Sequence, residues 1–265
     1  MEKAKKGVGI LLAAVFLVLT SVSGWDVSGA HTAQTPYNWY CKNREGHVRP
    51  SIAPEFSFIK DHGGYWLDER DPEEKVIYLT FDAGYENGNV EKILDTLKEH
   101  QATGAFFVLS NLVTTNTALV KRMKAEGHLV CNHTSKHKNM TKFTDFSSFE
   151  AELKALERVY LDATGEKLDP FYRPPEGCFS EENLDFAAQC GYKTVFWSFA
   201  YADWDNQKQM PAVKARDKIL AHTHNGMVLL LHPTSSTNAE ILDGILTEWE
   251  NQGYRFGTLY ELTGT

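Results

Sequence analysis

Short, mainly apolar runs recur along the chain from residue 76 onward. They lie at residues 76–81, 104–109, 128–131, 194–199 and 227–231. Runs of this length without strict polar alternation predict strands of a parallel sheet that is buried on both faces.

Amphipathic segments separate these runs. Val90, Ile93, Leu94 and Leu97 follow the spacing of one helical face, and comparable stripes begin at Leu119, Phe149 and Ile241. The alternation of strands with helices predicts an α/β fold built as a βα-repeat barrel or sheet. Reactive groups in such folds gather at the carboxyl ends of the strands.

The first 70 residues have a different pattern. Lys3, Lys5 and Lys6 precede an apolar run from about Val8 to Val22, which is typical of an export signal that is cleaved or kept as a membrane anchor. Cleavage after residue 24 and cleavage after residue 30 both remain open. Residues 31–70 are rich in aromatic residues and prolines without periodicity. We therefore expect a signal peptide or anchor at 1–30, an N-terminal extension packing on the domain at 31–70, and one catalytic domain at 71–265.

Composition narrows the class of partner. The 265 residues carry a net charge of -8 with a pI near 5.7 and no basic cluster beyond the leader, which argues against nucleic acid as a partner. Export places the protein outside the cytoplasm, with membrane contact only through an uncleaved leader.

The four cysteines, Cys41, Cys131, Cys178 and Cys190, are too few to build the fold by disulfides, and their spacings match no zinc motif. Free thiols and disulfides both remain open.

Candidate chemistry begins at two strand ends. Asp82 follows the first strand, and His133 and His137 follow the third. Two histidines four residues apart share one side of a helical turn and can bind one metal ion. The competing interpretations are an aspartate that caps a helix and two unrelated histidines in a solvated loop.

Further candidates complete an acid–base set. Arg173 precedes two prolines and can pair with a carboxylate such as Asp82. His232 ends the last strand and can act as a general acid if a carboxylate orients it. Asp203 is the candidate partner, with Asp205 as a competitor.

Taken in order, these residues resemble a known family. The segments Thr80-Phe81-Asp82-Ala83-Gly84, His133-Thr134-Ser135-Lys136-His137, Arg173-Pro174-Pro175, Asp203-Trp204 and Leu230-Leu231-His232 resemble the five motifs of the polysaccharide deacetylase family, also called the NodB-homology or carbohydrate esterase family 4 domain. The resemblance covers residues 74–262 and implies a distorted (β/α) barrel that removes N-acetyl groups from amino sugars.

The resemblance also implies a role for each residue. Asp82 matches the catalytic base, His133 and His137 the metal ligands, Arg173 the residue that tethers the base, Asp203 the residue that orients the acid, and His232 the acid. Water on the metal, deprotonated by Asp82, would attack the acetamide, and His232 would protonate the departing amine. Four residues in or beside the motifs are expected to contact the sugar: Tyr85, Asn87, Pro174 and Trp204.

Ala83 departs from the family pattern, because an acidic metal ligand usually follows the base. The surrounding sequence resembles the delta-lactam-biosynthetic de-N-acetylases, in which that acid is also replaced. Those bacterial enzymes deacetylate N-acetylmuramic acid in peptidoglycan and prepare muramic delta-lactam for the spore cortex. With two protein ligands, a divalent ion (Zn, Mn, Mg or Co) should be weakly held. Glu86 is a further candidate ligand, although an acid there is usually a solvated loop residue.

Two other functions fit the same residues. A deacetylase for chitooligosaccharides or N-acetylglucosamine polymers shares all five motifs. A cell-wall glycan-binding module that has lost catalysis with its third ligand would retain glycan without releasing acetate.

Overall fold

The computed structural model describes residues 35–265. Its strands are β1 Tyr37–Asn38, β2 Cys41–Lys42, β3 Ser51–Ile52, β4 Gly64–Tyr65, β5 Val76–Ala83, β6 Gly104–Val108, β7 Leu129–Asn132, β8 Phe171–Tyr172, β9 Cys178–Phe179, β10 Lys193–Val195, β11 Met227–Leu231 and β12 Arg255–Phe256. Its α-helices are α1 Val90–Glu99, α2 Ser110–Thr115, α3 Thr117–Ala125, α4 Phe146–Thr164, α5 Glu181–Gln189, α6 Ala212–Ala221, α7 Ser236–Asn251 and α8 Leu259–Thr263. Three short 3-10 helices are η1 Pro54–Lys60, η2 Met140–Lys142 and η3 Pro175–Gly177.

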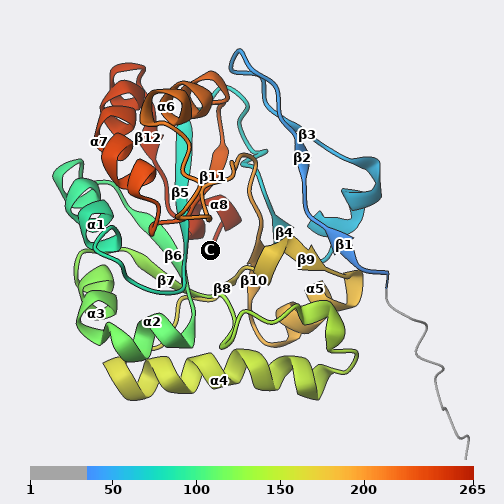
Figure 1. The fold of residues 1–265 in the computed structure, drawn as a ribbon. Coiled ribbons are helices and arrows are strands. Elements are labelled where there is room, and N and C mark those ends of the chain that lie inside the picture. Colours follow the sequence, from blue (N-terminus) through green and yellow to red (C-terminus); the bar gives the residue numbers. More distant parts are fainter. Residues whose placement is uncertain (1–34) are drawn as a thin grey trace, which may run out of the picture. The chain divides into compact units, whose positions relative to one another are not determined.

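Eight strands form one sheet, in the order β11-β5-β6-β7-β8-β10-β4, with β12 also paired to β5. Every pairing in this sheet is parallel. Single bridges from Leu67 and Phe199 to β11 join the two ends of the order. The sheet therefore curls into the distorted barrel, with helices around it (Figure 1).

Alternate residues of β5 face opposite sides of the sheet. Ile77, Leu79 and Phe81 pack among the surrounding helices, whereas Val76 and Tyr78 pack inside the barrel. This period of two explains the continuous apolar run, because both faces are buried.

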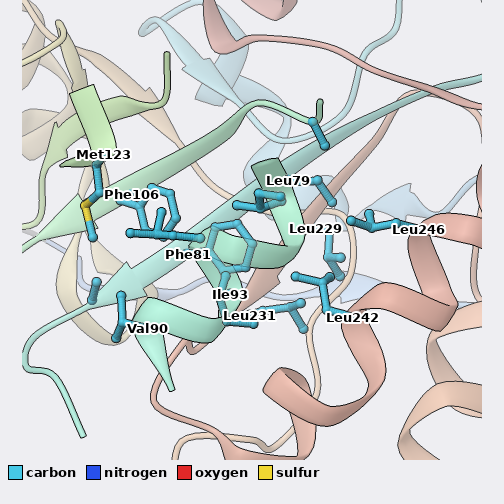
Figure 2. Packing of buried hydrophobic residues seen from close by; sticks show 14 of the residues in the cluster. Leu79, Phe81, Val90, Ile93, Phe106, Met123, Leu229, Leu231, Leu242 and Leu246 are labelled. Atoms are coloured by element: carbon cyan, nitrogen blue, oxygen red, sulfur yellow. The ribbon is translucent and has the colours of Figure 1, made fainter. Parts of the chain in front are cut away.

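The larger core lies between the sheet and the helices. Phe81 and Phe106 stack with their ring centroids 4.8 Å apart, and Ile93 of α1 and Leu242 of α7 belong to the same cluster (Figure 2). The predicted helical stripes are the buried faces of α1, α3, α4 and α7. Helix α8 belongs to the interior cluster through Leu259 and Leu262.

The N-terminal segment contributes to the sheets. β1 pairs with β9, and β4 pairs with β10 in the barrel. Trp39 stacks on Phe196 with centroids 4.7 Å apart and donates a hydrogen bond from Nε1 to the Trp197 carbonyl. Residues 31–70 are predicted to form an extension packing on the domain, and the described part of that segment supplies a barrel strand and part of the core.

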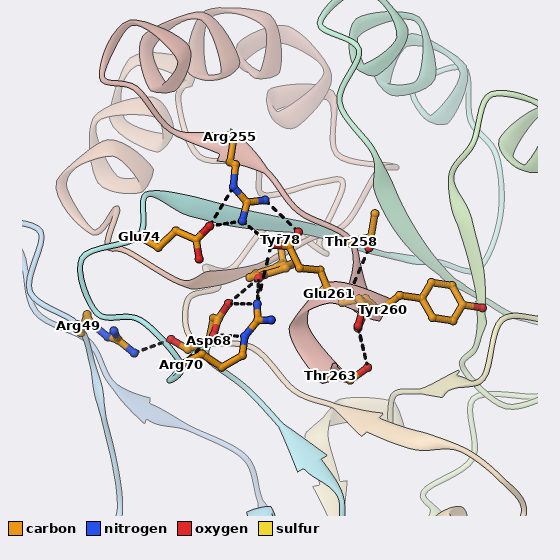
Figure 3. Close-up of polar contacts among 11 residues, drawn as sticks. Arg49, Asp68, Arg70, Glu74, Tyr78, Arg255, Thr258, Tyr260, Glu261 and Thr263 are labelled. Carbon is orange, nitrogen blue, oxygen red and sulfur yellow. Dashed lines mark hydrogen bonds and ion pairs between the residues drawn. The ribbon is translucent and has the colours of Figure 1, made fainter. Parts of the chain in front are cut away.

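A polar network closes the end of the barrel at which β5 begins (Figure 3). The buried carboxylate of Asp68 accepts hydrogen bonds from Arg70 at 2.6 and 2.9 Å and from the Tyr78 hydroxyl at 2.6 Å. Arg255 pairs with Glu74 and Glu261, so α8 is tied to the residues that precede β5. This network stabilises the end of β5 away from Asp82.

The observed strands agree closely with the predicted runs, except that in the run at 194–199 the strand ends at Val195 and only a single bridge from Phe199 to β11 follows. Within residues 35–265, no helix is long and apolar enough to cross a membrane. The signal peptide or anchor predicted at 1–30 lies outside the described residues.

Candidate active site

The alternation of side chains along the strands brings the predicted reactive residues to one side of the sheet. Interior side chains alternate along each strand, and the same alternation continues just past the strand end. The interior residues Tyr78, Cys131, Phe171 and Val228 are followed, at even steps, by Asp82, His133, Arg173 and His232. Parallel strands end at the same mouth of the barrel, so these four side chains converge there.

Arg173 is fully buried and holds Asp82. Its Nη1 donates to Asp82 Oδ1 at 2.9 Å, and its Nη2 donates to Thr80 Oγ1 at 2.9 Å. Burial raises the pKa of Asp82, but the neighbouring His133 imidazole and the Arg173 guanidinium outweigh it, so the net pKa lies below the ordinary value. The carboxylate is therefore ionised and fixed in orientation.

A loop brings His133 and His137 together, and the predicted helical turn between them is wrong. Residues 133–139 form no helix, and Thr134 and His137 have left-handed φ angles of 70° and 53°. The side chain of Thr134 accepts a hydrogen bond from the His137 backbone at 3.0 Å, which holds this loop. The imidazoles lie edge to face, with centroids 5.0 Å apart.

The atoms beside His133 that could coordinate a metal fit a cation. His133 Nδ1 donates to the Arg173 carbonyl at 2.9 Å, so Nε2 is the unprotonated nitrogen. Burial lowers the pKa of His133 to about 4, which keeps the ring neutral near pH 7. His133 Nε2 lies 3.6 Å from Asp82 Oδ2, so two acceptor atoms lie side by side.

Ala83 offers no ligand atom to such a cation. Among residues 35–265, no group of three or more histidine, cysteine, aspartate or glutamate side chains is arranged to hold a metal ion. The predicted ligands His133 and His137 do lie together at the cavity, whereas Glu86 accepts a hydrogen bond from the Gly88 backbone.

His232 and Asp203 form the second pair. His232 Nδ1 donates to Asp203 Oδ1 at 2.7 Å, and the His232 backbone donates to Oδ2 at 2.8 Å. Burial lowers the pKa of His232, but the hydrogen bond and charge of Asp203 outweigh it and raise the net pKa above 6.5. The competitor Asp205 instead accepts a hydrogen bond from the Gln207 backbone.

A cavity of about 570 Å³ lies over these groups. Its lining residues are Asp82, Gly84, Tyr85, Leu109, His133, His137, Glu176, Gly177, Trp197, Ala200, Tyr201, Trp204, Leu230, His232 and Thr234. Tyr85 and Trp204 are 44% and 62% exposed, so the rim presents two aromatic rings to solvent. A charged floor beneath an aromatic rim suits a sugar that carries an amide.

Two of the four predicted sugar contacts, Asn87 and Pro174, are not among the residues that line the cavity. Asn87 does not line the cavity, and its Nδ2 donates to the Thr234 carbonyl at 2.9 Å. Pro174 is buried and does not line the cavity either. The four cysteines are free thiols, and neither Cys131 nor Cys178 lines the cavity.

Sequence reasoning missed several residues around the cavity. Tyr201, Glu176 and Trp197 line it, and buried Asn238 of α7 contacts Asp203. Tyr201 stands two residues before Asp203, which is a signal that could have been used. Asn238 lies six residues after His232 in a new helix, and no spacing rule points to it.

Comparisons with known proteins cover most of the chain. A family model described as polysaccharide deacetylase matches residues 69–195. The peptidoglycan-N-acetylmuramic acid deacetylase PdaA of Bacillus subtilis is 39% identical over 228 residues, which are 86% of this chain and 86% of PdaA.

Solved structures show the same fold. That of Bacillus subtilis PdaA, a family 4 carbohydrate esterase, has a TM-score of 0.81 and 38% identity, covering 86% of this chain and 96% of that one. A family 4 carbohydrate esterase from Bacillus anthracis has a TM-score of 0.70 and 36% identity, covering 87% and 97%. The predicted fold is confirmed.

Proposed function

Because the chain belongs to the polysaccharide deacetylase family, we propose that it is a hydrolase that removes N-acetyl groups from N-acetylmuramic acid in peptidoglycan. One observation carries this proposal. A single cavity contains a carboxylate held by Arg173 and an imidazole held by Asp203, which are the base and the acid that amide hydrolysis needs.

Asp82 is the proposed base. A water molecule in the cavity attacks the acetamide carbon, and the ionised carboxylate of Asp82 accepts the proton that the water loses. The Arg173 guanidinium fixes Oδ1 of Asp82, and Oδ2 lies on the side of His133. Holding the base in advance removes the need to reorient it during the reaction.

His232 is the proposed acid. Its Nδ1 is held by Asp203, so Nε2 carries the proton available for transfer. As the carbon–nitrogen bond breaks, His232 gives this proton to the sugar nitrogen, and acetate and the free amine are released. The raised pKa of His232 favours the protonated ring at the start of the cycle.

His133 and His137 would hold a divalent ion, which supplies Lewis-acid stabilisation of the developing negative charge when bound. The Arg173 carbonyl fixes the His133 tautomer, so Nε2 is ready to coordinate without rotation. Two imidazoles without an anionic neighbour at position 83 imply weak binding. Zinc that survives dialysis against buffer, measured by metal analysis of the full chain, would contradict this.

The preference for muramic acid rests on the relatedness to PdaA and on the replacement at Ala83. In this proposal Tyr85 and Trp204 stack on sugar rings, which is supported by the exposure of both aromatic rings at the rim of the cavity. A peptidoglycan substrate implies an extracytoplasmic location. A role in the spore cortex stays a prediction of the sequence resemblance.

Acetate release tests the proposal. The full chain is assayed on peptide-stripped peptidoglycan and on chitooligosaccharides, with and without Mg, Mn, Zn or Co. We expect release from the muramic substrate, and Asp82→Asn and His232→Ala should each lower it by about 10²–10⁴-fold. Faster release from chitooligosaccharides would replace the substrate assignment, and glycan retention without any release would indicate a binding module.

A further inference from the structure

We propose that Asn238 is a positioning residue that holds the Asp203–His232 pair in its reactive geometry. This inference rests on the proposed function, because it concerns the general acid of that reaction. Asn238 is fully buried in the first turn of α7 and does not line the cavity, so it acts through its neighbours.

The amide of Asn238 bonds to both members of the pair. Its Nδ2 donates to Asp203 Oδ2 at 2.7 Å and to the backbone carbonyl of His232 at 3.1 Å. Asp203 Oδ2 also accepts from the His232 backbone at 2.8 Å, which leaves Oδ1 to the imidazole. Asn238 thus fixes the rotation of the carboxylate that in turn fixes the imidazole.

The orientation of this amide is determined by its surroundings. Both acceptors near Nδ2 lack a proton to donate, so a flipped amide would place its oxygen against a carboxylate and a carbonyl. On the other side, the Tyr201 hydroxyl donates to Asn238 Oδ1. Each polar atom of the Asn238 side chain therefore has a partner suited to it.

Helix α7 fixes the position of Asn238. Ser235 caps this helix, and its hydroxyl accepts a hydrogen bond from the Asn238 backbone at 3.1 Å. The Ser235 backbone donates to the His232 carbonyl at 3.1 Å, so the cap and the amide hold the same loop. The first turn of α7 is therefore built around the strand end that bears the acid.

The chain contains a matched control. Asn183 occupies the same position after the capping residue of α5, where Ser180 accepts from its backbone at 3.1 Å. Asn183 is 2% exposed, and its side-chain atoms have no hydrogen-bond partner among residues 35–265. Asn183→Ala thus tests the loss of a buried asparagine in a helix first turn without touching the acid.

Steady-state kinetics give the first test, with the full chain and peptide-stripped peptidoglycan. We expect Asn238→Ala to lower kcat about 10- to 100-fold. KM should stay within about twofold, because the lost contacts serve the acid and leave substrate binding intact. Asn183→Ala should match the wild type in both constants.

A double-mutant cycle separates positioning from general damage. If Asn238 acts through the acid, Asn238→Ala should slow the His232→Ala variant by no more than about twofold. Tyr201→Phe removes one hydroxyl and keeps the amide, so it is the variant to use if Asn238→Ala does not fold. We expect it to lower kcat about two- to tenfold, again with no added effect in His232→Ala.

A measurement without substrate keeps this inference separable from the proposed function. Nitrogen-15 NMR of labelled histidines reports which ring nitrogen of His232 carries the proton. In the wild type and in Asn183→Ala, neutral His232 should carry it on Nδ1, facing Asp203. In Asn238→Ala, the freed carboxylate should allow both tautomers.

The outcomes are distinct. An unchanged kcat, an unchanged tautomer, or a loss of kcat of equal size in the His232→Ala background would overturn the role of Asn238. A wild type that releases no acetate but shows the tautomer change would overturn the proposed function and leave the positioning of the imidazole standing.

Discussion

Arg173 combines structural and chemical roles in one side chain. In addition to Asp82 and Thr80, it donates from Nε to the Val195 carbonyl at 2.9 Å and from Nη2 to the Phe196 carbonyl at 3.1 Å. Its guanidinium carbon lies 4.2 Å from the centroid of the Phe107 ring. The fork geometry of arginine serves all these acceptors, and an ammonium group cannot.

Replacing Arg173 should therefore cost stability as well as activity. We expect Arg173→Ala to lower the free energy of unfolding by about 3–5 kcal/mol, because it leaves the Asp82 carboxylate buried without its partner. Urea denaturation measures this. Arg216, whose side chain is 55% exposed, supplies the control, and Arg216→Ala should change stability by less than about 0.5 kcal/mol. Similar stability in the two variants would contradict the structural role.

The pH profile of the reaction should reflect His232. The proposed acid must be protonated, so activity is present below its pKa and lost as pH rises through it. Because Asp203 raises this pKa, the alkaline limb of kcat/KM should lie above pH 6.5. Asp203→Asn removes the charge and should move this limb to lower pH. A limb that stays in place in that variant would remove His232 from the acid role.

At the scale of elements, the turn at η3 depends on one glycine. Gly177 has φ +67°, and a Cβ there would lie 2.9 Å from the Trp197 ring and 3.2 Å from the Trp39 Cβ. Trp39 donates its backbone hydrogen bond to the Gly177 carbonyl at 2.9 Å, so this turn joins the N-terminal segment to the cavity wall.

Substitution of this glycine should disturb the wall. We expect Gly177→Ala to lower the free energy of unfolding by about 1–3 kcal/mol more than Gly165→Ala does, because of the two contacts. Gly165 has φ +80° with nothing within 4 Å of an added Cβ, so both variants share the backbone strain. Thermal or urea unfolding compares them. Equal losses of unfolding free energy in the two variants would show that Trp197 and Trp39 shift to accommodate the added Cβ without cost.

The sequence predicted long elements well and short ones poorly. The run at 227–231 matches β11, because five buried residues carry a clear pattern. β1, β4 and β9 have two residues each, which is too short for any periodicity to appear. Their strand character depends on partners far along the chain.

For the candidate site, the sequence predicted which residues lie together where those residues stand at strand ends. Asp82 and His232 each continue an apolar run, so the alternation of inward and outward side chains along the two strands is enough to place them together. The spacing of His133 and His137 suggested a helix, but left-handed backbone at Thr134 and His137 produces a loop instead. Asn238 could not be predicted, because its contacts depend on how the first turn of α7 packs beside Asp203.

At the scale of the folded domain, burial of neutral histidines links stability to pH. His224 is 1% exposed, and its Nδ1 donates to the His222 carbonyl at 2.8 Å, which leaves Nε2 facing the Ser198 hydroxyl at 2.8 Å. Burial lowers the pKa of His224 to about 4, and burial likewise lowers that of His128 to about 4. Neither residue belongs to the proposed reaction.

These histidines should make the folded protein sensitive to mild acid. Their folded-state pKa lies below the unfolded value of 6.5, so the stability they contribute is fully present above pH 6.5 and is lost as pH falls towards 4. In that window the unfolded chain binds more protons than the folded one. We expect the free energy of unfolding to fall by up to about 3.5 kcal/mol for each histidine across this window, at about 1.4 kcal/mol per pKa unit.

Urea denaturation between pH 7 and pH 4 measures this dependence, and two variants assign it. His224→Gln removes one of the two titrating groups and should make the slope shallower, whereas Ser198→Ala removes the same hydrogen bond but keeps the imidazole and should retain the slope at a lower stability. Asp68 does not contribute to the pH dependence between pH 7 and pH 4. Burial raises the pKa of Asp68, but the hydrogen bonds from Arg70 and Tyr78 outweigh this and lower the pKa to about 2. The stability that Asp68 contributes is therefore lost only below pH 3.8. A slope that persists unchanged in His224→Gln would assign the acid sensitivity to other groups.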